Sequence, residues 1–140
     1  MMTNAAKIAE LKREWEGVIK MRERMRLLVV ATFAGGAITG RALADVMYNL
    51  PVLLAFDVLG QALTAMRDEK LFACPRKFLG DLMDGSKSAL PWIQFNNLRD
   101  GVRRRNEIAH DGMLFDSVQC LQDIASIEEQ LVAWSIIDKK

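Results

Sequence analysis

Apolar residues recur at helical spacing along the first part of the chain. Apolar side chains three, four or seven positions apart lie on one face of a helix, and here they are Ile8, Leu11, Trp15, Val18, Met25 and Val29. Arg22 is the one interruption, and most other charged residues lie off this stripe. Thr3 or Asn4 can cap such a helix at its start. The pattern predicts an amphipathic helix whose apolar face packs against the rest of the fold.

A second long helix is predicted from about Arg41 to Asp68. Its apolar residues surround most of the axis, which is typical of a helix at the centre of a domain. The glycine-rich stretch from Gly35 to Gly40 should break the chain before it, because glycine is a poor helix former. Pro51 falls in the middle of this helix, where it should remove one hydrogen bond and cause a kink.

Two further helices are expected after it. The stretch Cys74–Ser88 reads as a short helix between two turns. The next, third major helix should be capped by Ser88, carry Pro91 in its first turn and end near Gly112, a residue suited to the position after a helix end.

The last helix has the clearest start in the chain. Asp116 and Gln119 resemble a capping box, and Phe115 can pack against Cys120 as a hydrophobic staple. Its apolar stripe, three and four residues apart, is Cys120, Ile124, Ile127, Leu131 and Trp134. Strand patterns are nearly absent. The sequence therefore predicts a compact all-α bundle of four to five helices in a single domain, residues 1–140.

Composition narrows the function classes only slightly. Hydrophobic residues make up 51% of the chain and charged residues 26%, as in ordinary globular proteins. The net charge of +1 gives no overall attraction to polyanions, so any such affinity must come from local clustering. Cys74 and Cys120 match no metal or redox spacing. We interpret them as small buried hydrophobes, with a disulfide between them as the minor alternative.

The chain shows no sequence signal for secretion or membrane insertion. Its first residues are charged and amphipathic, unlike a signal peptide. The longest uncharged run, Leu27–Gly40, has 14 residues, fewer than the roughly 18–20 that a membrane-spanning helix needs. We expect a cytoplasmic protein without a membrane partner.

Arg105 and Asn106 are predicted to lie on the apolar side of the third major helix. At about 100° per residue, the inward stripe consists of Phe95, Leu98, Val102 and Ala109. On the same wheel, Arg103, Arg104 and Glu107 face water.

A guanidinium on the apolar side requires a partner, because burying it unpaired costs several kcal/mol. One interpretation is structural: an ion pair with Asp45 or Asp57, or a position at the wet edge of the stripe. The other is that Arg105 faces a cleft or a second subunit and holds an anion there, with Asn106 orienting it.

His110 is the only histidine of the chain. A histidine in the last helical turn interacts favourably with the helix dipole and needs no further role. On an ideal helix Arg105 and His110 differ by about 140° and about 7.5 Å of rise, so they cannot both contact one small group. A bend at the helix end, or pairing with the same helix of a second copy, would bring them together.

The segment RNEIAH, Arg105–His110, resembles the R-x4-6-H signature of HEPN domains, in which Asn, Asp or His commonly follows the arginine. The preceding FNNLRDGVRR is similar to the apolar and basic approach to that motif. The resemblance implies a metal-independent endoribonuclease that is active as a homodimer in a toxin–antitoxin, anti-phage or stress-response setting. RNA would be the substrate, and a cognate antitoxin or other regulatory protein would be a partner.

Carried onto this chain, the resemblance makes His110 the general acid or base at the 2′-OH and the leaving 5′-oxygen. Arg105 would stabilise the phosphorane, and Asn106 would orient it. The residue types suit this chemistry, since histidine titrates near neutrality and arginine binds phosphate oxygens in a bidentate manner. One histidine and no evident carboxylate cluster leave a two-metal site without ligands, so neither a metal nor another cofactor is expected.

Three more arginines precede or adjoin the motif. Arg99, Arg103 and Arg104 form either a rim that guides the RNA backbone or an ordinary solvated face. In HEPN toxins with a nucleotidyltransferase antitoxin, a tyrosine that accepts AMP often stands two residues after the histidine. Gly112 stands there in this chain, so that mode of control is not expected. The alternative function is a non-catalytic HEPN module for helical interaction or nucleotide binding, because fold does not guarantee chemistry.

Overall fold

The computed structural model describes residues 1–34, 36 and 46–139, with only the backbone for Thr32 and Phe33. This part of the chain forms five α-helices and no strand: α1 (Ala5–Ala34), α3 (Asn49–Asp68), α4 (Leu79–Ser86), α5 (Phe95–Asp111) and α6 (Ser117–Ala133). The predicted all-α bundle is confirmed. Apart from Gly36, the predicted glycine-rich break lies outside the described residues.

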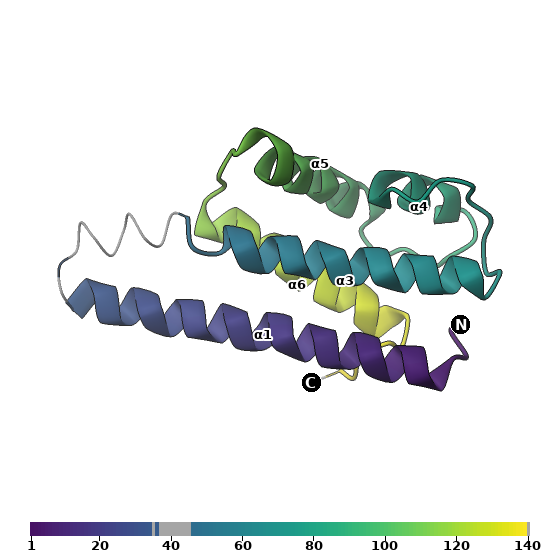
Figure 1. Ribbon diagram of the computed structural model, residues 1–140, viewed down its shortest axis with the longest axis horizontal. Coiled ribbons are helices and arrows are strands. Elements are labelled where there is room, and N and C mark those ends of the chain that lie inside the picture. The colour runs from purple at the N-terminus through teal and green to yellow at the C-terminus, as the bar shows by residue number, and fades with distance from the viewer. Residues whose placement is uncertain (35, 37–45, 140) are drawn as a thin grey trace.

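Helix α3 is the centre of the bundle and contacts each of the other four helices. In Figure 1, α1 runs along one side of α3, whereas α4 and α5 lie on the opposite side and α6 crosses behind it. By length and composition α3 could cross a membrane, with a mean hydropathy of 1.4, but 61% of that stretch is buried inside the fold. A helix in a protein core meets the same criteria. The predicted central position of this segment is confirmed.

Helix α1 packs through its predicted stripe. Leu11, Trp15 and Val18 are buried, and the Trp15 indole donates a hydrogen bond to Glu128 of α6 at 3.1 Å. Asn4 is the N-cap, since its Oδ1 accepts from the Lys7 N–H at 3.1 Å. The apolar stripe therefore has the partner that the sequence required.

The start of α3 differs from the prediction. Val46–Tyr48 form a turn and the helix begins at Asn49, so Pro51 lies in the first turn rather than in the middle. A proline in the first turn removes no helical hydrogen bond, because the N–H groups there have no partner within the helix. The predicted kink at Pro51 is therefore wrong. Positions 41–45 of the predicted helix lie outside the described residues.

The short helix expected within Cys74–Ser88 is confirmed as α4, but the next helix starts later than predicted. Ser88 and Pro91 precede α5, whose first residue is Phe95. Its predicted end is confirmed: Gly112 adopts the left-handed conformation with φ of +67°, which glycine tolerates without strain.

Residues 91–93 form a non-helical segment that is held by Gln130 of α6 and by Trp134, the residue that follows α6. The Ile93 N–H donates to Gln130 Oε1 at 2.9 Å, and Gln130 Nε2 donates to the Pro91 carbonyl at 3.1 Å. The Trp134 indole donates to the same carbonyl at 3.2 Å. The Ile93 N–H and the Pro91 carbonyl therefore have hydrogen-bond partners outside any helix, and α5 begins only after this segment.

Helix α6 starts as predicted. Asp116 Oδ1 accepts from the Gln119 N–H at 2.9 Å, and the predicted stripe from Cys120 to Trp134 is buried. The Gln119 side chain does not complete the capping box, because it donates to Asp123 instead. Both cysteine thiols are free: Cys120 is buried and Cys74 is half-buried.

Candidate functional site

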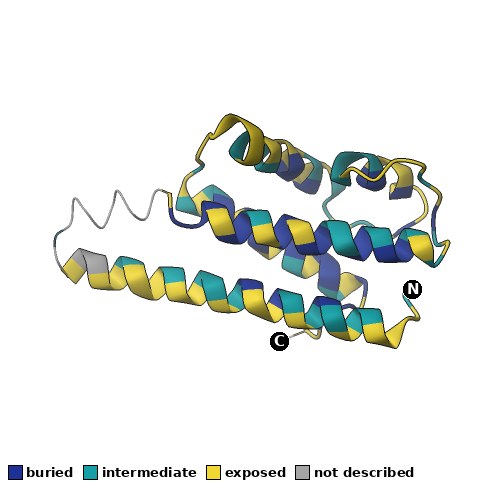
Figure 2. Ribbon diagram, in the orientation of Figure 1, coloured by how far each residue is buried: buried dark blue, intermediate teal, exposed yellow. Residues whose placement is uncertain are grey.

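The fully buried residues of α5 all lie in its first turns. Leu98, Gly101 and Val102 are buried against neighbouring helices. Asn106, Ala109 and His110 are exposed, and Figure 2 shows this end of α5 largely in the exposed and intermediate colours. The predicted inward position of Asn106 and Ala109 is therefore wrong. The wheel assumed a core along the whole helix, whereas beyond Val102 only some side chains, such as Arg104 and Ile108, remain partly covered.

Arg104 is the arginine that the fold buries. Its guanidinium binds Asp123 of α6 in a bidentate manner, with distances of 3.0 and 2.6 Å. The two side chains are only 16% and 9% exposed. The hydrogen bond to Asp123 raises the pKa of Arg104 above its ordinary value. The prediction that Arg104 faces water is wrong, because α6 covers a side of α5 that the wheel left to solvent.

Arg105 is half-buried and lines a groove of about 670 Å³. Its Nη1 donates to the side-chain oxygen of Asn106 at 3.1 Å. Its Nε is shielded from water and has no hydrogen-bond acceptor among the described residues. A shielded N–H without an acceptor is unfavourable, so the fold leaves this donor unsatisfied at a cost in free energy.

The structural interpretations of Arg105 are an ion pair with an acid or a position at the wet edge of the stripe, and its half-burial agrees with the second. Asp57 lines the same groove, but within the described part of the chain Arg105 forms no ion pair with it or with any other acid. The Asp57 carboxylate instead accepts a hydrogen bond from Gln61 Nε2 at 2.8 Å. The other predicted acid, Asp45, lies outside the described residues.

The walls of the groove come from three other parts of the fold. The outer face of α3 supplies Asp57, Gln61 and Thr64, and the start of α4 supplies Phe78. The groove continues toward the beginning of α1 at Lys7. Sequence reasoning missed this surface. The signal was a polar stripe at spacings of four, three and four residues, Asp57, Gln61, Thr64 and Asp68, on a helix otherwise apolar nearly all round.

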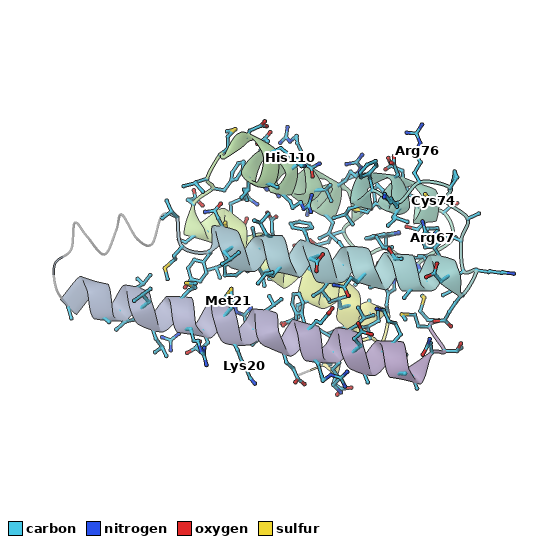
Figure 3. All side chains as sticks on the ribbon, viewed as in Figure 1. Lys20, Met21, Arg67, Cys74, Arg76 and His110 are labelled. Carbon is cyan, nitrogen blue, oxygen red and sulfur yellow. The ribbon has the colours of Figure 1, made fainter. Side chains whose placement is uncertain are left out.

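His110 lies apart from this groove. It is exposed in the last turn of α5, on the side of the molecule away from α1 (Figure 3), and is not among the lining residues. It forms no hydrogen bond or ion pair with the residues that the structure describes. Within one copy, the structure therefore brings Arg105 and Asn106 together but not His110, as expected from residues about 140° apart on one helix.

The remaining predicted arginines have different surroundings. Arg99 pairs with Asp84 of α4 at 3.1 Å and lies over Gly80, where a Cβ atom would come within 3.0 Å of the guanidinium. Arg103 is exposed and, within residues 1–34, 36 and 46–139, has no ion-pair partner. Arg99 and Arg104 thus hold α5 to its neighbours. Of the three arginines predicted to form a rim, Arg103 is the exposed one without an ion pair to the described residues.

No group of three or more His, Cys, Asp or Glu side chains in the described part of the chain could hold a metal ion. Comparison with known proteins found no matching family model, no matching curated protein and no matching solved structure. The site is therefore interpreted from its own geometry.

Proposed function

We propose that the protein is a metal-independent endoribonuclease of the HEPN type that cleaves RNA at a site shared by two copies. The supporting observation is that neither end of the RNEIAH motif forms an ion pair with the residues that the structure describes. Arg105 has a shielded N–H without an acceptor and no acidic partner in the described residues, and His110 is exposed and forms no hydrogen bond or ion pair there. A phosphate oxygen in the groove could accept hydrogen bonds from the Arg105 guanidinium. The exposed imidazole of His110 is accessible to an RNA strand.

The chemistry requires one proton acceptor, one proton donor and a cation. The imidazole of His110 takes the proton of the 2′-OH, and the 2′-oxygen attacks the adjacent phosphorus. The bond to the 5′-oxygen breaks, and this oxygen leaves with a proton donated by a His110 imidazolium at the shared site. The products are a 2′,3′-cyclic phosphate and a 5′-hydroxyl. Arg105 donates to the phosphate oxygens, where negative charge accumulates, and Asn106 keeps the guanidinium oriented.

A second copy completes the site. Within one straight helix Arg105 and His110 diverge by about 140°, whereas a twofold pairing of α5 ends would bring the His110 of one copy toward the Arg105 of the other. The uncovered end of α5 is followed by Met113 and Leu114, which are 50% and 58% exposed. Apolar side chains beside a polar site are suited to such an interface.

The setting follows from the same proposal. A ribonuclease of this type acts in the cytoplasm, in a toxin–antitoxin, anti-phage or stress-response system, under the control of an antitoxin or another regulatory protein. Arg103, exposed on the same helix, would attract the RNA backbone.

The test is cleavage of mixed RNA in EDTA. His110→Ala should reduce the rate by about 10²-fold or more, as expected for loss of a general base. Arg105→Lys keeps the charge but loses the bidentate geometry and should also reduce the rate. Arg13→Lys on the exposed face of α1 is the matched control and should leave it unchanged. Mass spectrometry of the products should show 2′,3′-cyclic phosphate ends.

Mixing two inactive variants tests the shared site. Dimers that combine one Arg105→Ala copy with one His110→Ala copy contain one intact site, so random mixing should restore about a quarter of the wild-type activity. No restoration would mean that each site belongs to one copy. Equal cleavage by the wild type and His110→Ala, or none by either, would contradict the enzyme proposal and favour a non-catalytic interaction or nucleotide-binding module.

A further inference from the structure

We infer that the groove beside Arg105 is a nucleotide subsite that selects guanine through Asp57 and Gln61 of α3. This inference rests on the proposed function in taking RNA as the ligand. It goes beyond that function by assigning a base preference and the side chains that produce it.

The Asp57–Gln61 pair presents hydrogen-bond acceptors to the groove. Gln61 donates its Nε2 to Asp57 Oδ2 at 2.8 Å, which fixes the amide so that its oxygen remains an acceptor. The other carboxylate oxygen of Asp57 has no hydrogen-bond donor among the described residues, and Asp57 forms no ion pair there. Asp57 is exposed, so its carboxylate carries no burial cost. A ligand that contacts this pair has to offer N–H or O–H donors, and among the parts of a base only N–H groups meet this need.

Guanine is the base whose edge best matches two neighbouring acceptors. It carries an amino group at N2 beside a ring N–H at N1, so one edge offers two adjacent donors to a carboxylate. In adenine and cytosine the amino group stands beside a ring nitrogen that accepts, and uracil has no amino group. An acceptor that faces Asp57 would be repelled by its charge. The pair therefore favours guanine over the other three bases.

The rest of the groove fits the other parts of a nucleotide. Its volume of about 670 Å³ lies within the range of about 300–1,000 Å³ that is common for small-molecule sites. Arg105 supplies a cation for the phosphate at the α5 wall.

An exposed aromatic ring completes the subsite. Phe78 of the α4 start is 69% exposed and lines the same groove. The next residue, Leu79, lies 3.7 Å from the position that a Cβ at Gly60 would take, which places the start of α4 against α3 beside Gln61. Phe78 can stack on the face of any base, so it adds affinity without selecting guanine.

The test is direct binding of GMP, AMP, CMP and UMP to the full chain by isothermal titration calorimetry. None of these probes contains a cleavable phosphodiester, so the measurement does not depend on catalysis. GMP should bind with a Kd at least tenfold below those of the other three. Asp57→Asn should remove this preference, and Gln61→Ala should raise the Kd of GMP selectively. Arg105→Lys and Phe78→Ala should weaken all four nucleotides by similar factors.

Asp100→Asn is the matched control, because Asp100 is exposed on α5 and is not among the groove residues. It should retain the preference for GMP. Asp57 is itself exposed, so its variant should fold normally, which circular dichroism will verify. Equal Kd values for the four nucleotides, no measurable binding, or a preference that survives Asp57→Asn would overturn the inference.

The two proposals can fail separately. Selective GMP binding that depends on Asp57, in a protein that cleaves no RNA, supports the guanine subsite and removes the nuclease proposal. Cleavage of RNA by a protein that binds the four nucleotides equally overturns the guanine subsite and leaves the nuclease proposal in place.

Discussion

Gly101 of α5 lies directly against Phe56 of α3, so that a Cβ atom at position 101 would stand 2.6 Å from Phe56 Cζ. Glycine allows the two helix backbones to approach at this point. Arg105 follows Gly101 by four residues and therefore lies on the same face of α5 one turn later. The contact between Gly101 and Phe56 thus determines how far Arg105 stands from the α3 wall of the groove.

Gly101→Ala should destabilise the protein by about 1–3 kcal/mol, the usual cost of overpacking a core. Gly17→Ala is the matched control, because a Cβ at Gly17 meets nothing within 4 Å. In an exposed helix interior, that change should stabilise the protein by up to about 1 kcal/mol. Urea denaturation of the two variants gives the free energies of unfolding. A neutral Gly101→Ala would contradict the close helix contact.

Arg104→Ala should cost about 3 kcal/mol of stability, because it leaves the buried Asp123 carboxylate without a cation and with only the Gln119 hydrogen bond. Arg103→Ala, one residue earlier and exposed, should change stability by no more than about 0.5 kcal/mol. Chemical denaturation of both variants at neutral pH makes the comparison. Similar values for the two arginines would show that Arg104 is not the buried one.

Gln130→Leu should destabilise the fold by about 1–3 kcal/mol, since it leaves the Ile93 N–H without an acceptor. Gln122→Leu on the exposed side of α6 serves as the control and should have little effect. Amide hydrogen exchange at Ile93 gives a second readout. Its protection should fall in the Gln130 variant and remain in the control.

The pH dependence of stability should reveal the buried Cys120 thiol. Burial, with smaller contributions from Asp123 and Asp116, raises the pKa of this thiol from 9.0 to about 11. As the pH rises from 9 to 11, the unfolded chain loses the proton while the folded chain keeps it, so this contribution to stability decreases. The difference in unfolding free energy between wild type and Cys120→Ala should therefore shrink over this range. A constant difference would contradict the raised pKa.

Local patterns predicted the helices well where packing follows from one segment alone. The α1 stripe with its Asn4 cap, the Asp116 cap of α6 and the end of α5 at Gly112 all follow from neighbouring residues. The start of α5 could not be predicted in this way, because the Pro91 carbonyl is bound by Gln130 and Trp134, which are distant in the sequence. Such contacts have no local signature.

The site shows the same division. The wheel placed Arg105 correctly on a packed side, yet it assigned Arg104 to water because the sequence does not reveal that α6 covers a second side of α5. Ala109 was wrongly predicted to be buried for a related reason. The apolar pattern of one helix does not show how far along it the neighbouring helices extend. Predicting the groove would have required knowledge that α4 and α5 pack beside the polar stripe of α3.

The exposed residues at the end of α5 and the buried residues at its start should differ in how replacements affect protein abundance. Asn106 and His110 contribute little to the packed interior, so amino-acid replacements there should leave cellular abundance nearly constant. Replacements at Leu98 or Val102 should instead deplete the protein, whatever its role. A mutational scan scored for abundance should therefore tolerate replacements of Asn106 and His110, whereas the proposed function predicts that a scan scored for biological effect does not.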